Sequence, residues 1–171
     1  MEPAETRAIP FDFEAFFHDH YLRLARILAR IVGDYGRAED LASEALWKLW
    51  RTEQAHGEKA GGWLYRTAVR IGLNDLRSHR RRNRYESLSD VPPGFQTPEE
   101  ARAAEEEREQ VRRVLALLRP REAELLILYS SELSYEEIAA ALELNPASVG
   151  TLIARARQAF RKEFVKQYGE R

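Results

Sequence analysis

The chain contains no cysteine, no long apolar run and almost no net charge. Without cysteine it forms no disulfide and carries no thiolate chemistry, which fits the reducing cytoplasm. A membrane-spanning helix needs about 20 mainly apolar residues in a row, and no segment has them, so we expect no membrane insertion. The N-terminal sequence MEPAETRAIP also lacks the apolar stretch of a signal peptide. We therefore expect a cytoplasmic protein.

Catalytic and metal-binding patterns are missing as well. Of the four histidines, His18 and His20 are two positions apart, a spacing that does not place them on one helix face. The sequence has no HExxH motif, no glycine-rich phosphate loop and no nucleophile elbow. We expect no metal, no cofactor and no catalytic residue, and the protein is predicted not to be an enzyme.

The near-neutral total hides a strong segregation of charge. Residues 66–84 hold seven arginines and one aspartate, a net charge of +6, whereas residues 86–109 hold eight acids and two arginines, a net charge of −6. Residues 155–166 are basic again, with five bases and one acid. Two basic segments separated by an acidic one predict two nucleic-acid surfaces joined by a connector that avoids nucleic acid.

The hydrophobic periodicity is helical throughout, and no strand pattern of useful length occurs. Segment 87–96, with two prolines and a glycine, shows no periodicity and is interpreted as a linker. The predicted fold is all-α, with two small helical modules at 10–85 and 111–170 joined by a flexible acidic linker at 86–110. Helices are expected over about 12–32, 37–51, 63 into the arginines, 97–118 and 121–132, with a polar loop at 52–62.

A helix-turn-helix is predicted between Ser134 and Arg157. Ser134 and Glu137 form a capping box, in which each side chain satisfies a free backbone N–H at the start of a helix. After a turn, Asn145 is an N-cap and Pro146 stands at the first helical position, where its missing N–H is not needed. An ordinary helical hairpin with a solvated basic face is the alternative.

The second helix of this pair has two distinct faces. One side is apolar and is expected to pack on the scaffold. The other carries small and hydroxyl-bearing residues followed by bases, which suits a helix that reads base edges and then contacts phosphates. The predicted DNA-contacting residues on this face are Ser148, Thr151, Ala154, Arg155, Gln158 and Arg161.

The helix that begins near Trp63 carries a second polar face. Arginines can follow a nucleic-acid backbone, an amide can read a base edge and an aromatic ring can stack on a base, so this mixture suits a strand that has been opened. For Trp63, packing in the core is an equally supported alternative. The predicted residues are Trp63, Arg66, Arg70, Asn74, Arg77 and Arg81.

Several segments resemble the extracytoplasmic-function (ECF) sigma factors of bacterial RNA polymerase, over nearly the whole chain. Residues 38–45, AEDLASEA, are similar to the segment of that family that docks on the polymerase clamp helices, and 63–68, WLYRTA, to the segment that recognises and melts the −10 element. Residues 118–122, LRPRE, together with 134–139, SYEEIA, and 147–149, ASV, resemble its −35-reading domain.

The resemblance implies promoter-specific transcription initiation, with promoter DNA and core RNA polymerase (clamp helices and flap) as partners. It also implies an anti-sigma factor as a partner, and a loop at 52–62 that receives a flipped −10 base. Four residues depart from the family's usual pattern, namely Ser43, Arg70, Gly150 and Leu152. The residues implied for polymerase binding are Glu39, Asp40, Ser43, Glu44 and Trp47.

Two other functions stay open on the sequence. A sigma-like adaptor could recruit polymerase without reading a promoter, which the absence of bases at Gly150 and Leu152 would allow. A stand-alone regulator could use only the helix-turn-helix, but it would leave the first module without a role. Exposure of Asp40 and Glu44 on one helix face would favour a polymerase-binding protein, since like charges four residues apart disfavour an isolated helix.

Overall fold

The structure is a computed structural model that describes residues 11–82 and 98–169, and within these ranges all regular structure is helical. The first module contains α1 (Phe13–Val32), α2 (Tyr35–Trp50), the short 3-10 helix η1 (Glu53–Ala55) and α3 (Ala60–Arg82). The second contains α4 (Pro98–Leu117), α5 (Pro120–Ser130), α6 (Tyr135–Leu142) and α7 (Pro146–Tyr168). The predicted all-α fold with two helical modules is confirmed.

The first two helices begin and end where local chemistry directs them. The Asp12 side chain accepts a hydrogen bond from the backbone N–H of Ala15, which caps α1, and Gly33 ends it in the left-handed conformation with φ of 79°. Asp34 then caps α2 by accepting from the N–H of Arg37. Helix α2 therefore starts two residues earlier than the pattern predicted.

Helix α3 begins at Ala60, so the predicted loop at 52–62 is too long. Two consecutive glycines at 61 and 62 are poor helix formers and suggested a loop. In the folded protein Gly62 lies against α6, where an added Cβ would be 3.2 Å from the backbone of Ala140. This close approach of two helices outweighs the low helix propensity of glycine.

The helix-turn-helix is confirmed in detail. Glu137 N donates to Ser134 Oγ at 3.1 Å and Ser134 N donates to Glu137 Oε2 at 2.7 Å, which completes the capping box of α6. Glu143 ends α6 in the left-handed conformation, and Asn145 caps α7 by accepting from Ala147 N. The predicted linker segment 87–96 and Thr97, where the next helix was expected to begin, lie outside the described residues, while 98–110 belongs to α4.

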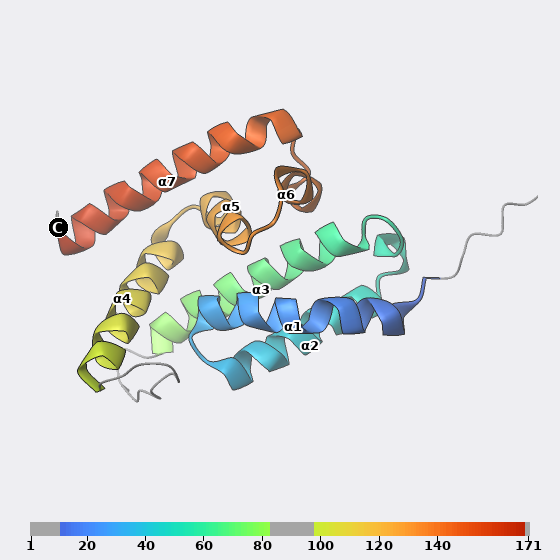
Figure 1. Cartoon of the computed structure of the whole chain (residues 1–171), viewed down its shortest axis with the longest axis horizontal. Helices are drawn as coiled ribbons and strands as arrows, with labels where there is room; N and C mark the ends of the chain where they lie inside the picture. The colour runs from blue at the N-terminus through green and yellow to red at the C-terminus, as the bar shows by residue number, and fades with distance from the viewer. Residues whose placement is uncertain (1–10, 83–97, 170–171) are drawn as a thin grey trace, which may run out of the picture.

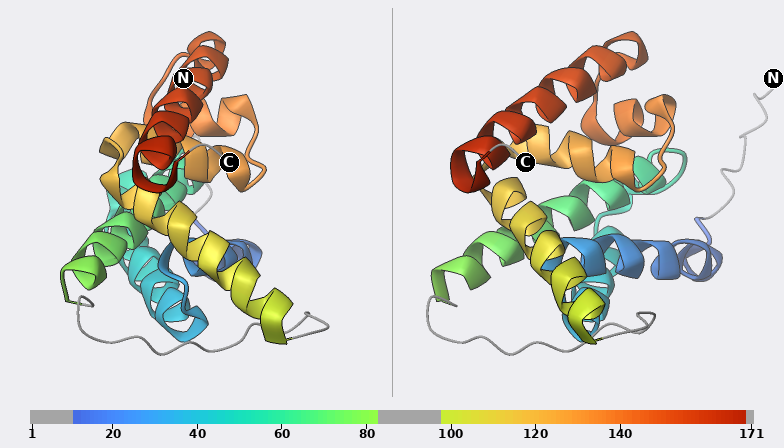
Figure 2. Two further views of the ribbon diagram at one scale, coloured as in Figure 1. Left: turned by 90° about the vertical axis from the view of Figure 1, so that its left-hand side faces the viewer. Right: turned by 60° about the vertical axis from the view of Figure 1, so that its left-hand side comes forward.

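The two modules pack directly against each other (Figure 1). Helix α3 of the first module contacts α5 and α6 of the second, and the buried apolar side chains of both modules form one continuous cluster. Helix α7 lies on the side of the second module that faces away from α1 and α2. Helix α4 extends from the second module along the first module (Figure 2). The outer face of α7 is therefore free of the first module.

Candidate nucleic-acid and polymerase interfaces

The predicted −35 face of α7 is a continuous exposed surface. Val149, Ile153 and Ala156 are buried on the opposite side, as the periodicity predicted. The side chains that the sequence assigned to DNA all lie on the exposed side of the helix, namely Ser148, Thr151, Ala154, Arg155, Gln158 and Arg161. The geometry needed for a helix to enter a major groove is thus present.

The two α7 positions that lack the family's bases differ in their surroundings. Leu152 is half-buried and packs against the core. At Gly150 an added Cβ would lie 3.3 Å from the ring of Tyr135, so the glycine lets the start of α6 approach α7 closely. Leu152 is therefore part of the module's packing, whereas at Gly150 only an exposed and movable ring stands near an added side chain.

The predicted −10 face of α3 contacts the second module. Arg70 Nε donates to Glu124 Oε1 at 2.8 Å, although the Glu124 carboxylate is nearly fully buried. Arg66 pairs with Glu143 at 2.8 Å, and its hydrogen bond and positive charge lower the pKa of the Glu143 carboxyl. Asn74 is exposed, and the side chain of Arg81 lies outside the described residues.

The partial burial of Trp63 fits both interpretations that the sequence left open, stacking on a base and packing in the core. Its side chain is half-buried and packs against the core. Tyr65, two residues further along, is buried and accepts or donates a hydrogen bond with His20 Nδ1 at 3.1 Å. Burial raises the pKa of the Tyr65 hydroxyl and lowers that of the His20 ring. The start of α3 thus combines partly or fully buried aromatic rings with a hydrogen-bonded histidine.

The predicted polymerase face of α2 is open. Asp40 and Glu44 are both exposed, and Glu44 already forms an ion pair with Lys48 at 3.0 Å. Ser43 is exposed and donates to the carbonyl of Glu39, and the Trp47 side chain is 57% exposed. The exposure of both acids meets the condition set from the sequence for a polymerase-binding protein.

The sequence missed a neighbouring apolar groove. It combines the start of α1 with the exposed side of α2, and Trp50 is 52% exposed within it. The signal was available in the sequence as three phenylalanines in the first turns of α1. The lining residues are Phe13, Phe17, Ser43, Leu46, Trp47 and Trp50.

Within residues 11–82 and 98–169, no group of three or more histidine or acidic side chains is placed to hold a metal ion. Over the same ranges, every helix is too short or too polar to cross a bilayer. The candidate binding surfaces of the described residues are the α7 face, the α3 face and the α2 face with its groove.

Comparison with known proteins gives two family matches in the order of the modules. Residues 16–82 match Sigma-70 region 2, and residues 108–160 match Sigma-70, region 4. The first match covers α3 to its end, and the second begins inside α4 and ends within α7.

Two curated relatives match the chain over most of its length, and a third over about half of it. The chain is 29% identical to the ECF RNA polymerase sigma factor SigE of Mycolicibacterium smegmatis over 97% of its own length and 66% of that protein. It is 25% identical to SigK of Mycolicibacterium vanbaalenii, with 88% of the chain and 80% of the relative covered. With SigL of Mycobacterium tuberculosis it shares 32% identity over 53% of each protein.

Solved structures share the fold. The sigma factor RpoE of Bartonella quintana, in complex with the anti-sigma factor NepR, aligns with a TM-score of 0.53 at 18% identity, over 89% of this chain and 96% of that one. CnrH in complex with the cytosolic domain of CnrY aligns with a TM-score of 0.53 at 22% identity, over 88% and 85% of the two chains. With region 2 followed by region 4 and relatives that span both, the chain belongs to the extracytoplasmic-function sigma factors of the sigma-70 family.

Proposed function

We propose that this protein directs core RNA polymerase to specific promoters by holding the polymerase with α2 and reading DNA with α7 and α3. The observation that carries this proposal is the pairing of an exposed helix-turn-helix face with an exposed acidic and aromatic face on the other module. A stand-alone DNA-binding regulator would use the first of these surfaces and leave the second without a role.

The −35 element would be read in the major groove by the exposed face of α7. Arg155 is the best candidate for a guanine contact, because a guanidinium can bond both acceptors of that base and such a pair discriminates by about 1–3 kcal/mol. Arg161 lies further along the helix and would contact phosphate. Leu152 packs against the core rather than on the DNA side, whereas the missing base at Gly150 leaves an adaptor without promoter reading as the alternative function.

The −10 element would be held by the basic face of α3. Arg66 and Arg70 would follow the backbone of the opened strand and Asn74 would contact a base edge, while segment 52–62 would receive a flipped base. The boundaries proposed for these roles are 10–85 for the −10 and polymerase-binding module, 86–110 for the connector and 111–170 for the −35 module.

Polymerase would be held through α2. Asp40 and Glu44 offer negative charge, and Trp47 offers an exposed ring of the kind that anchors protein interfaces. The clamp helices and the flap are the proposed docking sites for the first and second modules. An anti-sigma factor is a further proposed partner, since RpoE, a protein of similar fold, carries one in its solved complex.

Sigma factors initiate transcription without catalysing a reaction, and we propose the same for this chain, with the cytoplasm as its compartment. The test is run-off transcription with purified core polymerase on a library of random promoters. Wild type should enrich a two-part motif. Arg155→Ala should lose the upstream half, and Asp40→Ala should lose enrichment altogether.

Matched controls isolate the two surfaces. Arg157→Ala removes the same charge from α7, but its guanidinium stacks over the ring of Tyr129 rather than facing the DNA side, so the motif should persist. Asp19→Ala removes an exposed aspartate from α1 and should leave activity unchanged. Polymerase binding without any enriched motif would contradict promoter reading, and absence of polymerase binding would contradict the sigma role.

A further inference from the structure

The segment between α2 and α3 is held by backbone hydrogen bonds near both of its ends. The N–H of Ala55 donates to the carbonyl of Thr52 at 2.8 Å, and the N–H of Ala60 donates to that of Gly57 at 3.0 Å. Ala55 and Ala60 are both buried, whereas residues 57–59 are exposed. The segment therefore presents a short exposed tip between two buried anchors.

The side chain of His56 fixes the first of these anchors. Its Nε2 donates to the carbonyl of Leu49 near the end of α2 at 2.9 Å, since a carbonyl oxygen can only accept. Its ring also stacks on that of Phe11, with centroids 4.5 Å apart and an angle of 20° between the planes. Phe11 precedes α1, whose start lies at the same end of the first module as this segment (Figure 1). His56 thus ties the segment to both α1 and α2.

From Phe11, a continuous series of ring contacts leads to α3. Phe11 contacts Phe16 with centroids 5.2 Å apart, and Phe16 contacts His20 at 4.1 Å. The His20 ring meets that of Tyr65 at 5.7 Å and shares a hydrogen bond with its hydroxyl at 3.1 Å. Together with His56, five rings in contact therefore join the segment to Tyr65 on α3.

The two ends of this series carry the two parts of the proposed −10 site. Segment 52–62 would receive a flipped base, and α3 would hold the opened strand. A loop that is already ordered in its binding conformation loses little conformational freedom when its ligand binds, so binding is tighter. Gly57 in the tip has no atom within 4 Å of an added Cβ, so nothing packs around the tip at this residue. The order of the tip must therefore come from its anchors.

We propose that His56 is a positioning residue for −10 recognition, which together with Phe11 holds the tip in a fixed place relative to α3, so that the flipped base meets a preformed site. The inference rests on the proposed function of segment 52–62 and does not require His56 to touch DNA. His56 is half-buried and lies outside the cluster of core side chains, so its loss frees the tip without opening the core.

Two measurements on the full chain test this role. Backbone nitrogen-15 order parameters of residues 57–59 report whether the tip is ordered before DNA binds. Run-off transcription with core polymerase on the library of random promoters reports base discrimination at the −10 half and at the −35 half of the motif separately. Thermal denaturation followed by circular dichroism checks the folding of every variant.

Three variants separate the two contacts of the His56 side chain. His56→Ala removes the hydrogen bond and the ring together. His56→Gln keeps an N–H donor for the carbonyl of Leu49 without the ring, and His56→Phe keeps a ring for Phe11 without the donor. The matched control is His18→Ala, which removes an exposed histidine of α1 whose ring contacts Phe17 of the same helix.

In wild type, the order parameters of the tip should be near those of the helices, about 0.85, and in His56→Ala they should fall below about 0.6. His56→Ala should also lower discrimination at the −10 half by about three- to tenfold, the range expected for one lost hydrogen bond and the added cost of ordering the tip. The −35 half should be unchanged. His56→Gln and His56→Phe should each recover part of both losses, and His18→Ala should match wild type.

An ordered tip in His56→Ala would overturn the positioning role, and so would a disordered tip with unchanged −10 discrimination. Equal losses at the −10 and −35 halves, together with a lower melting temperature, would also overturn it, because they would reflect a general loss of folding. If wild type enriches no motif at all, the proposed function fails and the inference fails with it, which is seen before any variant is compared.

Discussion

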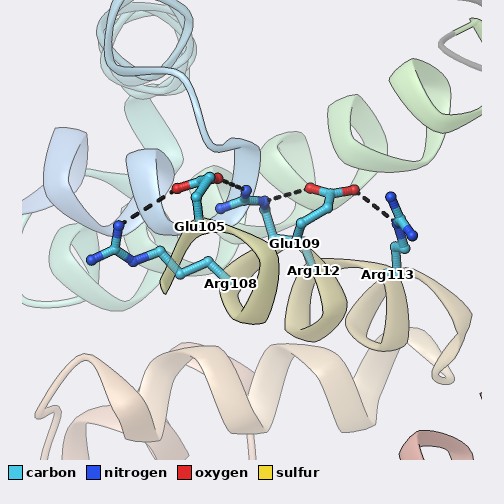
Figure 3. A network of polar contacts seen from close by, with 5 residues as sticks. All are labelled: Glu105, Arg108, Glu109, Arg112 and Arg113. Carbon is cyan, nitrogen blue, oxygen red and sulfur yellow. Dashed lines mark hydrogen bonds and ion pairs between the residues drawn. The ribbon is translucent and has the colours of Figure 1, made fainter. Parts of the chain in front are cut away.

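The guanidinium of Arg112 lies directly against the backbone of Gly33, so that a Cβ at position 33 would be 2.9 Å from Cζ of the arginine. Arg112 is 7% exposed and is held between Glu105 and Glu109 of its own helix (Figure 3). This contact seats α4 on the corner between α1 and α2, which is also where Gly33 must adopt a positive φ.

Gly33→Ala should therefore lower the free energy of unfolding by about 2–3 kcal/mol, from left-handed strain and from displacement of Arg112. Urea denaturation measures it. Gly57→Ala is the matched control, because Gly57 also has a positive φ, 92°, but no atom within 4 Å of an added Cβ. Its free energy of unfolding should fall by only about 1 kcal/mol, from the left-handed strain alone. Equal losses in the two variants would show that the Arg112 contact contributes nothing.

Arg37 supports a nearly buried carboxylate. Its Nη2 and Nε donate to Asp75 Oδ1 at 2.6 and 3.0 Å, and Asp75 is 9% exposed at its side chain. Arg37→Ala should destabilise the protein by about 1–3 kcal/mol, because the carboxylate loses its guanidinium partner and keeps only the His79 ring, 3.6 Å from its other oxygen. Adding Asp75→Asn should recover part of that loss in thermal denaturation. Arg26→Ala, at an exposed position of α1, is the control and should change stability by less than about 0.5 kcal/mol.

His20 makes stability depend on pH. Burial is the main reason that its pKa lies below the usual value of about 6.5, although Asp19 raises it and Arg23 lowers it further. The unfolded chain then binds more protons than the folded one in this range, so stability is complete above about pH 6.5 and falls as the pH drops toward the folded pKa.

His20→Gln should flatten this decline in melting temperature between about pH 7.5 and 5.5, while the exposed His18→Gln should keep the wild-type slope. A His20→Gln variant with an unchanged slope would assign the acid sensitivity to other groups. Tyr65, which shares a hydrogen bond with His20, should keep its place in both variants.

Two helical glycines should respond in opposite ways to alanine. At Gly72 an added Cβ would be 2.9 Å from Leu28 and 3.2 Å from Ile31, both fully buried, so Gly72→Ala should cost about 1–3 kcal/mol. At Gly150 the neighbour is the ring of Tyr135, which is 43% exposed and free to turn outward. Gly150→Ala should therefore gain about 0.5–1 kcal/mol of helix propensity. If Gly150→Ala loses stability as Gly72→Ala does, the ring of Tyr135 is held in place and does not turn outward.

Local chemistry made the helix-turn-helix predictable. Ser134, Glu137 and Asn145 act through backbone groups two or three residues away, so their pattern alone defines where α6 and α7 begin. The exposed face of α7 followed from periodicity. The sequence alone could not show whether Asp40 and Glu44 are exposed, and in the fold both side chains are exposed.

Contacts between distant segments were not predictable from periodicity. Arg70 and Glu124 are 54 positions apart, and each alone is typical of a solvated helix face. The start of α3 was missed because Gly62 favours a loop until α6 packs against it. Burial of Arg112 was missed because the charge of α4 suggested a connector in water. In each case a tertiary contact overrode a correct local preference.

Helix α7 runs without a break for 23 residues, about 34 Å, from the predicted DNA face to the end that packs on α4. It therefore moves as one rigid rod, packed on α4, α5 and α6. A tilt of about 10° at its N-terminal end displaces the other end by about 6 Å. Since Arg113 of α4 is hydrogen-bonded to Tyr168 at that far end, DNA bound to the first turns of α7, as proposed, would also constrain the direction of α4.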